Sequence, residues 1–420
     1  MSKEEVERNE KEYFKGWLDG IYRSFPNPDE LSFFEHNLEV WRQLWRVCEI
    51  SDVLLIVADI RHPVLNFPPS LYKYISDVLR KPLYLVLTKT DLVADEVVQE
   101  WVAYIKLSYP LVMVVDLSIY NLETLSKEKL RRYTSASGAE ILLKLLRKDS
   151  PNPFQEEWDQ YIRKRFDLRE FSHLEDILVD HSLRDKDFYT IGTIGHPNAG
   201  KSSLINSILG KKIVSASRTP GHTKHFQTIH LTKHIRLCDC PGLIFPMCVP
   251  QWLQIVSGLY NVAQVKDPYE PLMHLARLID ISSMLGLPRK PRNILQVCEG
   301  NHISFITSSF TSCILDFAEL KGFHTAKAAR PDIYRAANFI LRAVIDGRIL
   351  LSWKPPGYYQ KHDEESRQKL ESSDETNFDE EEVQSEGAEI EPESKPLTGV
   401  LGGSFGGLLE EAATDKEQEY

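Results

Sequence analysis

Short apolar runs of strand length alternate with helical patterns through the first 240 residues, and this alternation restricts the fold more than any other feature of the chain. We expect strands at six of these runs: Asp52–Asp59, Leu83–Thr88, Leu111–Asp116, Phe188–Ile194, His225–Leu231 and Ile235–Asp239. The first three are almost continuously apolar, which is typical of parallel strands covered on both faces. Six strands interleaved with helices predict an α/β domain with a doubly wound, mainly parallel sheet.

A helical pattern precedes the first strand. Residues 4–48 have helical spacing, with Trp41 and Trp45 on one face. We therefore expect a helical N-terminal segment at residues 1–50 that packs on the α/β domain, which is predicted at residues 51–262.

A smaller, mainly helical domain is expected at residues 263–361. Its clearest helix is Pro331–Ile345, because a proline stands at the start of this range and Gly347 follows its end. The stretch Trp353–Gly357 contains two prolines and marks the last folded boundary. The tail at residues 362–420 has no apolar periodicity and is rich in Glu, Ser, Asp and Gly, so we expect it to be disordered.

The net charge of −11 is unevenly distributed along the chain. Residues 363–420 carry −15, residues 1–194 carry −7, and residues 195–362 carry +11. The acidic total therefore does not exclude nucleic acid as a partner. Any contact with RNA phosphates is expected in the basic C-terminal half, before the acidic tail begins.

Composition excludes several other classes of protein. Every apolar stretch is shorter than the roughly 18 residues that a membrane helix needs, and Met1–Glu12 lacks the apolar core of a secretory signal. Six cysteines without a CxxC pair argue against a disulfide framework or a zinc module. We expect a monomer with no membrane partner in the cytoplasm or the nucleus, and the acidic start of the chain gives no support for nucleolar targeting.

The segment Gly195–Ser202 reads GHPNAGKS and matches the pattern GxxxxGK[ST] between a predicted strand and a predicted helix. The two glycines let the backbone wrap closely around phosphates with its N–H groups pointing inward. The Lys side chain reaches the β- and γ-phosphates, the Ser hydroxyl is a Mg²⁺ ligand, and the helix N-terminus favours an anion. The residues expected to contact the phosphates are Asn198, Ala199, Gly200, Lys201, Ser202 and Ser203.

A second short pattern, Asp239-Cys240-Pro241-Gly242, follows the sixth predicted strand. Asp239 suits a water-mediated contact to Mg²⁺, and the backbone N–H of Gly242 suits a γ-phosphate. The alternative is an ordinary turn at a strand end, because Pro-Gly is a common turn dipeptide. In the loop before the fifth predicted strand, Thr223 is the candidate for a hydroxyl that joins Mg²⁺ only when the γ-phosphate is present, and Thr219 is its rival.

A carboxylate that can read a purine base follows the second predicted strand, in Thr88-Lys89-Thr90-Asp91. Ligands bind at this end of the strands in open α/β sheets. Asp91 can accept two hydrogen bonds from guanine, and adenine offers no such donor pair. Lys89 can lay its alkyl stem over the base. The alternative is that Asp91 caps the helix after it.

Four segments, TKTD, GHPNAGKS, RTPGHT and DCPG, resemble the motifs of small GTPases, but the base-reading motif comes before the phosphate loop instead of after it. This order resembles that of the circularly permuted GTPases of the YlqF/YawG family. The segments DIRHP, CDCPGLIFP and TAKAARPDIYRAAN add to the likeness, which spans roughly residues 10–358. The resemblance implies a circularly permuted P-loop GTPase domain, binding of GTP and GDP, GTP hydrolysis and a role in ribosome assembly.

The chain departs from the family pattern around the base. Thr88 stands where Asn is commoner, which predicts weaker bracing of the loop. The resemblance also implies a Ser-Ala turn that completes the guanine contact. Ser135 and Ala136, in Thr134–Gly138, are one candidate for this turn, and Leu117-Ser118 is the alternative.

The residue after Gly242 is Leu243, where a Ras-like enzyme has a water-orienting Gln. Since an apolar side chain cannot orient the attacking water, we expect slow intrinsic hydrolysis. Asn198 resembles an Asn that helps to bind K⁺ in related GTPases, and the alternative role is a loop-stabilising amide. The expected catalytic residues are Lys201, Asn198 and Thr223, and the expected Mg²⁺ ligands are Ser202, Thr223 and Asp239.

The segment after Gly242 runs straight into the C-terminal helices instead of returning to the sheet, so the γ-phosphate state could move the C-terminal domain as a lever. Its basic side chains give it the charge that pre-ribosomal RNA requires, although a solvated helix face is the plainer interpretation. These side chains are Lys321, Lys327, Arg330, Arg335 and Arg342.

Three hypotheses about function follow from these patterns. The first is a Mg²⁺-dependent GTP-binding protein and slow GTPase that acts as a nucleotide-controlled switch, with pre-ribosomal RNA or ribosomal proteins as partners. The second is a scaffold that binds GTP with negligible hydrolysis. The third is a P-loop enzyme that uses ATP, in which case the match at Thr88–Asp91 would be accidental.

Overall fold

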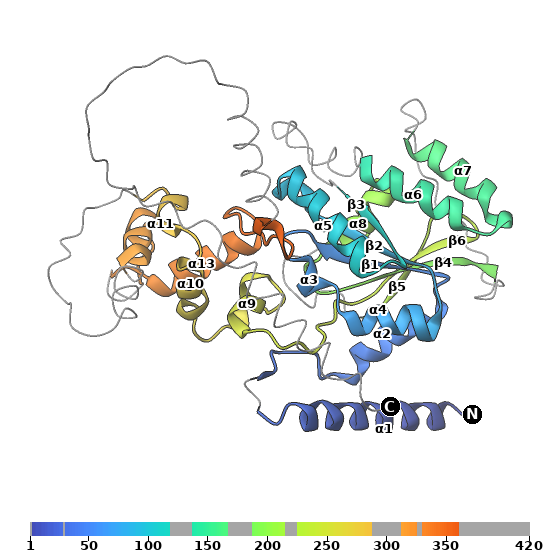
Figure 1. Cartoon of the computed structure of the whole chain (residues 1–420), viewed down its shortest axis with the longest axis horizontal. Coiled ribbons are helices and arrows are strands. Elements are labelled where there is room, and N and C mark those ends of the chain that lie inside the picture. The colour runs from blue at the N-terminus through green and yellow to red at the C-terminus, as the bar shows by residue number, and fades with distance from the viewer. Residues whose placement is uncertain are drawn as a thin grey trace, which may run out of the picture.

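A six-stranded sheet forms the centre of the structure, a computed structural model that describes residues 2–27, 30–117, 137–166, 187–214, 225–287, 312–325 and 330–360. The order of the strands is β3-β2-β1-β4-β6-β5 (Figure 1). The bounds of the strands are β1 Val53–Asp59, β2 Leu83–Thr88, β3 Val112–Asp116, β4 Tyr189–Ile194, β5 Gln227–His230 and β6 Ile235–Asp239. Every neighbouring pair is parallel except β5 and β6, which are antiparallel.

The strands form because their apolar side chains are buried on both faces of the sheet. In β1, Leu54, Ile56 and Ala58 belong to one hydrophobic cluster, whereas Val53, Leu55 and Val57 belong to a second. The strands at the two edges are shorter than predicted, since β3 exposes Met113 and β5 is exposed or half-buried throughout. The predicted α/β fold with a doubly wound, mainly parallel sheet is confirmed.

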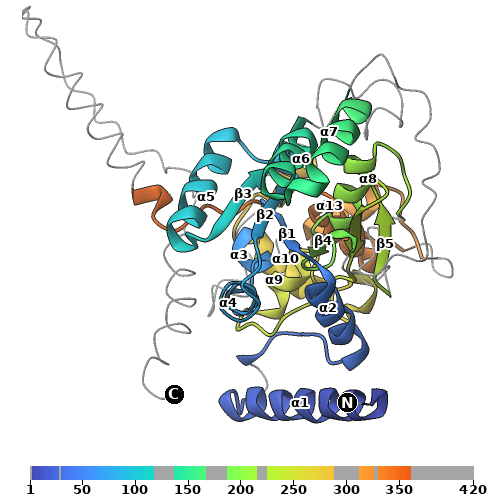
Figure 2. The ribbon, with the colours of Figure 1, turned by 90° about the vertical axis from the view of Figure 1, so that its right-hand side faces the viewer.

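Helices cover both faces of the sheet (Figures 1 and 2). The first cluster joins the sheet to α2, to α5 and to α4, which continues as a π-helical segment. The second cluster joins it to α6, α7 and α8. The bounds of these helices are α2 Leu38–Ile50, α4 Pro69–Lys73 with the π-helical segment Tyr74–Leu79, α5 Asp95–Ser108, α6 Ser137–Asp149, α7 Asn152–Phe166 and α8 Lys201–Leu209.

The expected N-terminal helical region consists of two helices. The first, α1, spans Lys3–Ser24 and begins with a capping box between Ser2 and Glu5. The second is α2, whose start is fixed by the Asn37 side chain accepting a hydrogen bond from the backbone of Glu39. The helical pattern expected over residues 4–48 therefore does not form one helix. Pro26 and the Asn37 cap favour an interruption between α1 and α2.

Aromatic rings join this N-terminal region to the sheet domain. The rings of Trp17 and Trp41 lie 4.7 Å apart, and the ring of Trp41 lies 5.4 Å from that of Phe245, in the segment after β6. Trp41 is buried and Trp45 is half-buried, so both predicted face residues point towards the interior.

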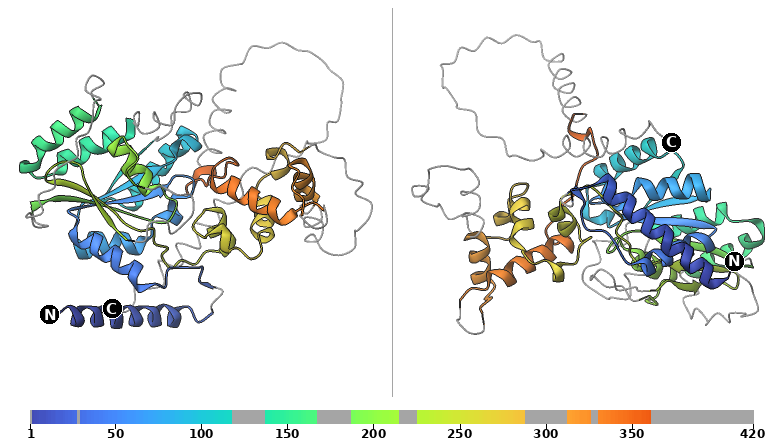
Figure 3. Two further views of the ribbon diagram at one scale, coloured as in Figure 1. Left: turned by 180° about the vertical axis from the view of Figure 1, so that it is seen from behind. Right: turned by 90° about the horizontal axis from the view of Figure 1, so that it is seen from below.

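Helices after β6 surround a third hydrophobic cluster, beside the sheet (Figure 3). They are α9 Gln251–Val256, α10 Tyr269–Ala276, α11 Ile281–Met284, a helical segment at residues 312–320 and α13 Ile333–Ile345. The Asp332 side chain caps the start of α13, and Gly347, with φ +76°, follows its end. The helix therefore begins two residues after Pro331.

The chain returns to the sheet domain after α13. The backbone N–H of Trp353 donates to the carbonyl of Arg61 at 2.8 Å, and the indole of Trp101 donates to the carbonyl of Trp353 at 3.0 Å. The predicted acidic tail lies outside the described residues, and the domain boundaries at residues 50, 262 and 361 remain predictions. No helix in the described parts of the chain is both long and apolar enough to cross a membrane.

Candidate nucleotide-binding site

The loop Gly195–Ser202 connects β4 to α8 at the carboxyl edge of the sheet. Gly195 has φ +141°, and a Cβ atom there would lie 2.6 Å from the carbonyl oxygen of Val57 in β1. Gly200 has φ +105° and precedes the first turn of α8, and Asn198 also has a positive φ, of 59°. The loop therefore leads tightly into a helix N-terminus whose free N–H groups favour an anion.

Lys201 lies across the base of this loop. Its ammonium donates to the carbonyls of Gly195 and His196, at 3.0 and 2.7 Å. Burial lowers the pKa of Lys201, although the neighbouring Asp239 acts in the opposite direction. The ammonium of Lys201 is thus held inside the loop, where phosphate oxygens could accept the hydrogen bonds that the two loop carbonyls accept in this structure.

Ser202 and Asp239 meet beside this lysine. The Ser202 hydroxyl donates to Oδ2 of Asp239 at 3.1 Å, and Asp239 ends β6 in register with Thr193 of β4. Oδ1 of Asp239 is buried and has no hydrogen-bond partner in the described structure. Burial raises the pKa of Asp239, because no cation compensates fully for its lost hydration.

This pair fits a Mg²⁺ ion that also binds phosphates. Mg²⁺ takes oxygen ligands and is usually held by one or two protein groups together with phosphate and water. Within the described ranges, no group of three His, Cys, Asp or Glu side chains could hold a metal ion. The unpartnered oxygen of Asp239 and the Ser202 hydroxyl could serve as the protein ligands of such an ion.

The segment after β6 packs directly on the loop. A Cβ atom at Gly242 would lie 2.7 Å from the backbone of Pro197 and 3.1 Å from the ammonium of Lys201. The N–H of Leu243 donates to the carbonyl of Gly195 at 3.3 Å, and the Leu243 side chain is buried. The residue in the position of a water-orienting Gln therefore faces the hydrophobic core.

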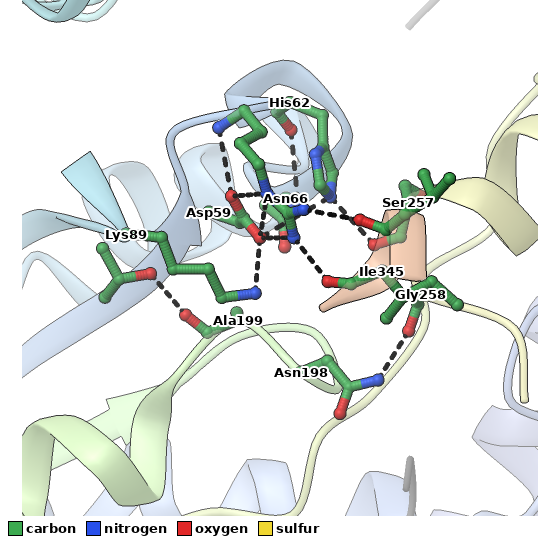
Figure 4. A network of polar contacts seen from close by, with 12 residues as sticks. Asp59, His62, Asn66, Lys89, Asn198, Ala199, Ser257, Gly258 and Ile345 are labelled. Atoms are coloured by element: carbon green, nitrogen blue, oxygen red, sulfur yellow. Dashed lines mark hydrogen bonds and ion pairs between the residues drawn. The ribbon is translucent and has the colours of Figure 1, made fainter. Parts of the chain in front are cut away.

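The base-reading segment touches the same loop. The Thr88 hydroxyl lies 2.6 Å from the carbonyl of Ala199, which Figure 4 labels, and 3.1 Å from the carbonyl of Ala58. Thr88 thus braces the loop by one hydrogen bond, although an Asn is commoner at this position of the family pattern.

Asp91 lies in a short 3₁₀ turn after β2, at Thr90–Leu92. One of its carboxylate oxygens is buried without a hydrogen-bond partner among the described residues, and burial raises its pKa. The next helix begins only at Asp95, and its N-cap is Ala94. The alternative role of Asp91 as a helix cap was therefore wrong.

Lys89 makes an ion pair that the sequence did not reveal. Its ammonium lies 2.6 Å from Oδ2 of Asp59, which is buried at the end of β1 (Figure 4). Burial would raise the pKa of Asp59, but Lys89, His62 and Arg61 together hold this pKa well below its usual range. One sequence feature could have indicated this ion pair. The apolar run of β1 ends in Asp59, and Lys89 directly follows Thr88, where the second predicted strand ends.

Arg61 joins this ion pair to the C-terminal helices. Its Nη2 lies 2.7 Å from Oδ2 of Asp59, and Nη1 and Nη2 donate to the carbonyls of Val344 and Ile345, at 3.0 and 3.1 Å. Both charged side chains are almost fully buried. The guanidinium therefore caps the last turn of α13, where a cation is favoured.

Two further hydrogen bonds reach the segment after α9. The Nε2 atom of His62 lies 2.9 Å from the carbonyl of Ser257, and the amide nitrogen of Asn198 donates to the carbonyl of Gly258 at 2.9 Å. Burial lowers the pKa of His62 to about 4, so its ring is neutral and donates from Nε2. The phosphate loop is thus joined to the C-terminal helices as well.

Several predicted residues lie outside the described parts of the chain. They are Thr219, Thr223, Ser135, Ala136, Ser118 and Lys327. Ser203 lies in the first turn of α8, and Ala199 lies in the loop before it. The structure brings together the base-reading segment, the phosphate loop and Asp239 at one edge of the sheet.

This fold and this site define a circularly permuted P-loop GTPase domain. The base-reading strand β2 and its neighbour β1 precede the phosphate-loop strand β4 in the sequence, yet β1 pairs directly with β4. A family model described as 50S ribosome-binding GTPase matches residues 190–284.

Curated relatives confirm the family resemblance of the sequence motifs. The chain is 39% identical over 396 residues to guanine nucleotide-binding protein-like 1 of Rattus norvegicus, a match that covers 86% of this chain and 64% of the relative. The protein of the same name from Homo sapiens is 38% identical over the same span. The chain therefore spans 64% of the length of these relatives, which is less than two thirds.

Two more distant matches are a yeast protein and a solved structure. Large subunit GTPase 1 of Schizosaccharomyces pombe is 31% identical over 363 residues, which are 84% of this chain and 56% of the relative. The GNP-bound structure of YlqF from T. maritima is 18% identical, covers 76% of this chain and 97% of that chain, and has a TM-score of 0.42.

Proposed function

We propose that this chain is a Mg²⁺-dependent GTP-binding protein and slow GTPase that acts as a nucleotide-controlled switch in ribosome assembly. One observation carries this proposal: the phosphate loop, the unpartnered oxygen of Asp239 and the unpartnered oxygen of Asp91 lie at one sheet edge, braced by the bond between Thr88 and Ala199. Buried carboxylate oxygens without partners are costly and indicate that a ligand supplies the missing contacts.

The residues would bind the nucleotide as follows. The backbone from Asn198 to Ser203 and the ammonium of Lys201 would hold the phosphates, and Gly242 would donate its N–H to the γ-phosphate. Asp91 would accept hydrogen bonds from guanine, and the stem of Lys89 would lie over the base. Ser135 and Ala136 would complete the base contact.

Mg²⁺ would be held by Ser202 and Asp239, with Thr223 joining in the GTP-bound state. When bound, the ion neutralises negative charge on the phosphates. The protein positions these ligands through the register of β6 and β4, and Lys201 provides a second positive charge beside them.

Hydrolysis would be slow, because the buried Leu243 cannot orient a water molecule. K⁺ is proposed to supply the missing charge through Asn198. The amide nitrogen of Asn198 is engaged by Gly258, which leaves its carbonyl oxygen for a cation. GTP turnover in KCl should exceed turnover in NaCl at equal ionic strength, and equal rates would exclude a role for K⁺.

The direct test of nucleotide specificity is competition for a bound fluorescent GDP. Unlabelled GTP should displace it and ATP should not, because adenine lacks the donor pair that Asp91 reads. Asp91→Asn should lose GDP affinity by at least about 100-fold, or roughly 2.7 kcal/mol, and should gain affinity for xanthosine diphosphate. Equal displacement by ATP would instead support an ATP-using enzyme.

A GTP-binding scaffold with negligible hydrolysis is the second candidate, and the burial of Leu243 favours it. Release of phosphate over many turnovers at saturating GTP separates the two. More than one phosphate per protein molecule supports the GTPase, whereas release that stops at or below one supports the scaffold.

The partner is proposed to be pre-ribosomal RNA or a ribosomal protein, in the cytoplasm or the nucleus. The names of the matched family and of the yeast relative refer to the ribosome or its large subunit. In this chain Arg335 and Arg342 are exposed on α13, and Lys321 and Arg330 are exposed in the segments between the C-terminal helices. Affinity purification with GTP and with GDP should recover ribosomal RNA or protein in a nucleotide-dependent amount, and recovery of neither would contradict this role.

A further inference from the structure

The end of α13 is linked to both candidate nucleotide-binding loops, directly to one and through Gly258 to the other. A Cβ atom at Gly347 would lie 2.6 Å from Cδ1 of Leu92, in the turn that holds Asp91. A Cβ atom at Gly258, whose carbonyl accepts from Asn198, would lie 3.0 Å from the side chain of Ile345. The base loop thus contacts the end of this helix directly, and the phosphate loop reaches it through Gly258.

Arg61 is the side chain that holds this junction together. Its Nε and Nη2 bind the carboxylate of Asp59, and its Nη1 and Nη2 bind the last-turn carbonyls of α13 (Figure 4). The same Oδ2 of Asp59 accepts from Lys89. One planar guanidinium with several fixed donors can make all these contacts at once, whereas an ammonium on a flexible stem cannot.

We propose that Arg61 is a positioning residue for guanine nucleotide binding, which through Asp59 fixes Lys89 in the base site and through Val344 and Ile345 couples that site to α13. The inference rests on the proposed function, because it requires that Lys89 lies over a guanine base. Asp59 and Arg61 do not touch the nucleotide. They act on it only through Lys89 and through the loop that carries Asp91.

The coupling works in both directions. A long Lys side chain loses considerable rotamer freedom when it is ordered, and a buried carboxylate that is already oriented removes part of this cost from nucleotide binding. A nucleotide that holds Lys89 in place then also stabilises Asp59, Arg61 and the end of α13, because an effect of one site on another is reciprocal in free energy. Docking of the C-terminal helices and occupation of the base site should therefore favour each other.

The test compares Arg61→Gln with Arg348→Gln in the full chain. Arg348 lies beyond the same helix end, but it is exposed and pairs with Asp346 at 3.4 Å instead of Asp59. Arg61→Gln should weaken binding of fluorescent GDP by about 10-fold or more, whereas Arg348→Gln should stay within about 2-fold of the wild type. Hydrogen exchange adds a readout that general destabilisation would not reproduce: GDP should protect the last turn of α13 in the wild type and in Arg348→Gln, but not in Arg61→Gln.

Each outcome has a definite meaning. If the wild type binds GDP no better than ADP, the proposed function fails before Arg61 is tested. If the wild type prefers GDP, and Arg61→Gln keeps both its affinity and the GDP-dependent protection of α13, the positioning role is overturned. If GDP still protects α8 in Arg61→Gln while protection of α13 is lost, the coupling is supported.

Arg61→Lys and Leu92→Ala cover the case in which Arg61→Gln does not fold. Arg61→Lys keeps the charge beside Asp59 but cannot reach Asp59 and two carbonyls together, so GDP binding should weaken by several-fold. Leu92→Ala removes the contact with Gly347 and leaves the ion pairs intact, so it should reduce the GDP-dependent protection of α13. Wild-type behaviour of both variants would overturn the inference.

Discussion

Asp91 and Asp239 share an unusual condition at the level of single residues. Each keeps one buried carboxylate oxygen without a hydrogen-bond partner in the described structure, and burial raises the pKa of each. An unpartnered buried acceptor costs about 1–3 kcal/mol. Under the proposed function, guanine donors at Asp91 and a divalent cation at Asp239 would recover this cost, so local stability would be given up where affinity is gained.

The tight contact at Gly242 leads to a first prediction. In Gly242→Ala, the new methyl group would meet backbone atoms of Pro197 at 2.7 Å and the ammonium of Lys201 at 3.1 Å. Because backbone cannot move aside cheaply, the phosphate loop should be displaced and GDP affinity should fall by at least about 10-fold, or 1.4 kcal/mol. Isothermal titration measures this.

Gly16→Ala is the matched control. Gly16 lies in α1 and a Cβ atom there meets nothing within 4 Å. This variant should bind GDP as the wild type does and should be more stable by about 0.5–1 kcal/mol, because Ala favours a helix. Normal GDP binding by Gly242→Ala would show that the loop adapts to the added methyl group.

Two buried histidines predict how stability depends on pH. Burial lowers the pKa of His62 to about 4 and that of His196 to about 3, from an ordinary value near 6.5. Between these values the unfolded chain binds protons that the folded chain does not, so the free energy of unfolding falls as the pH is lowered below about 6.5. From pH 7 to pH 5, each histidine should remove about 1–2 kcal/mol.

Urea titrations at a series of pH values check this slope. His62→Gln keeps a donor for the carbonyl of Ser257 and should flatten the slope between pH 6 and pH 5 by about 1 kcal/mol per pH unit. The raised pKa values of Asp91 and Asp239 act in the opposite sense, chiefly at lower pH. An unchanged slope in His62→Gln would show that this ring titrates normally in the fold.

At the level of secondary-structure elements, two helices have their last carbonyls bonded to an arginine side chain from another part of the chain. Arg61 caps α13, and Arg165 of α7 donates to the carbonyls of Ser207 and Ile208 at the end of α8, at 2.9 and 3.0 Å. Cations are favoured at these ends because the last carbonyls carry partial negative charge. The helix that begins at the phosphate loop is therefore held at its other end by α7.

Arg165→Met should loosen the end of α8. The substitution keeps much of the apolar stem but leaves two buried carbonyls without these donors, so the free energy of unfolding should fall by about 1–3 kcal/mol. Arg163→Met is the control, since Arg163 is exposed on the same helix and should change stability by less than about 0.5 kcal/mol. Chemical denaturation measures both, and equal effects would contradict a capping role.

The strands were predictable from sequence because burial on both faces leaves an unbroken apolar run, as in β1 and β2. The phosphate loop and Asp91 were predictable because their spacing is local. The contact of Arg61 with α13 was not, since its two partners lie 283 and 284 residues away and the arginine stands in an irregular segment. The break between α1 and α2 was missed because apolar periodicity continues on both sides of Pro26.

At the level of the whole molecule, the segment after α13 ties the C-terminal helices to the sheet domain. The Trp353 side chain packs on both the first and the third hydrophobic clusters, and its backbone bonds to Arg61 and Trp101. This residue therefore joins the core on one face of the sheet to the core of the C-terminal helices.

Trp353→Ala should separate the unfolding of these two cores. Loss of the half-buried ring should cost about 2 kcal/mol, and calorimetry should show the helical part unfolding at a lower temperature than the sheet domain. Trp252 stacks on His274 within the C-terminal helices, with ring centroids 5.0 Å apart. Trp252→Ala should lower stability without separating the transitions, and a single transition in both variants would contradict the joining role of Trp353.

The place of β4 in the sheet has a consequence for synthesis on the ribosome. The strands β1, β2 and β3 leave the exit tunnel first, and the edge of β1 that β4 will occupy stays open until residues 189–194 follow. During that interval the nascent sheet has a long apolar edge that can pair wrongly, and no phosphate loop with which a nucleotide could stabilise it. A nucleotide bound as proposed could therefore assist only the last stage of folding, after β6 has brought Asp239 into the sheet.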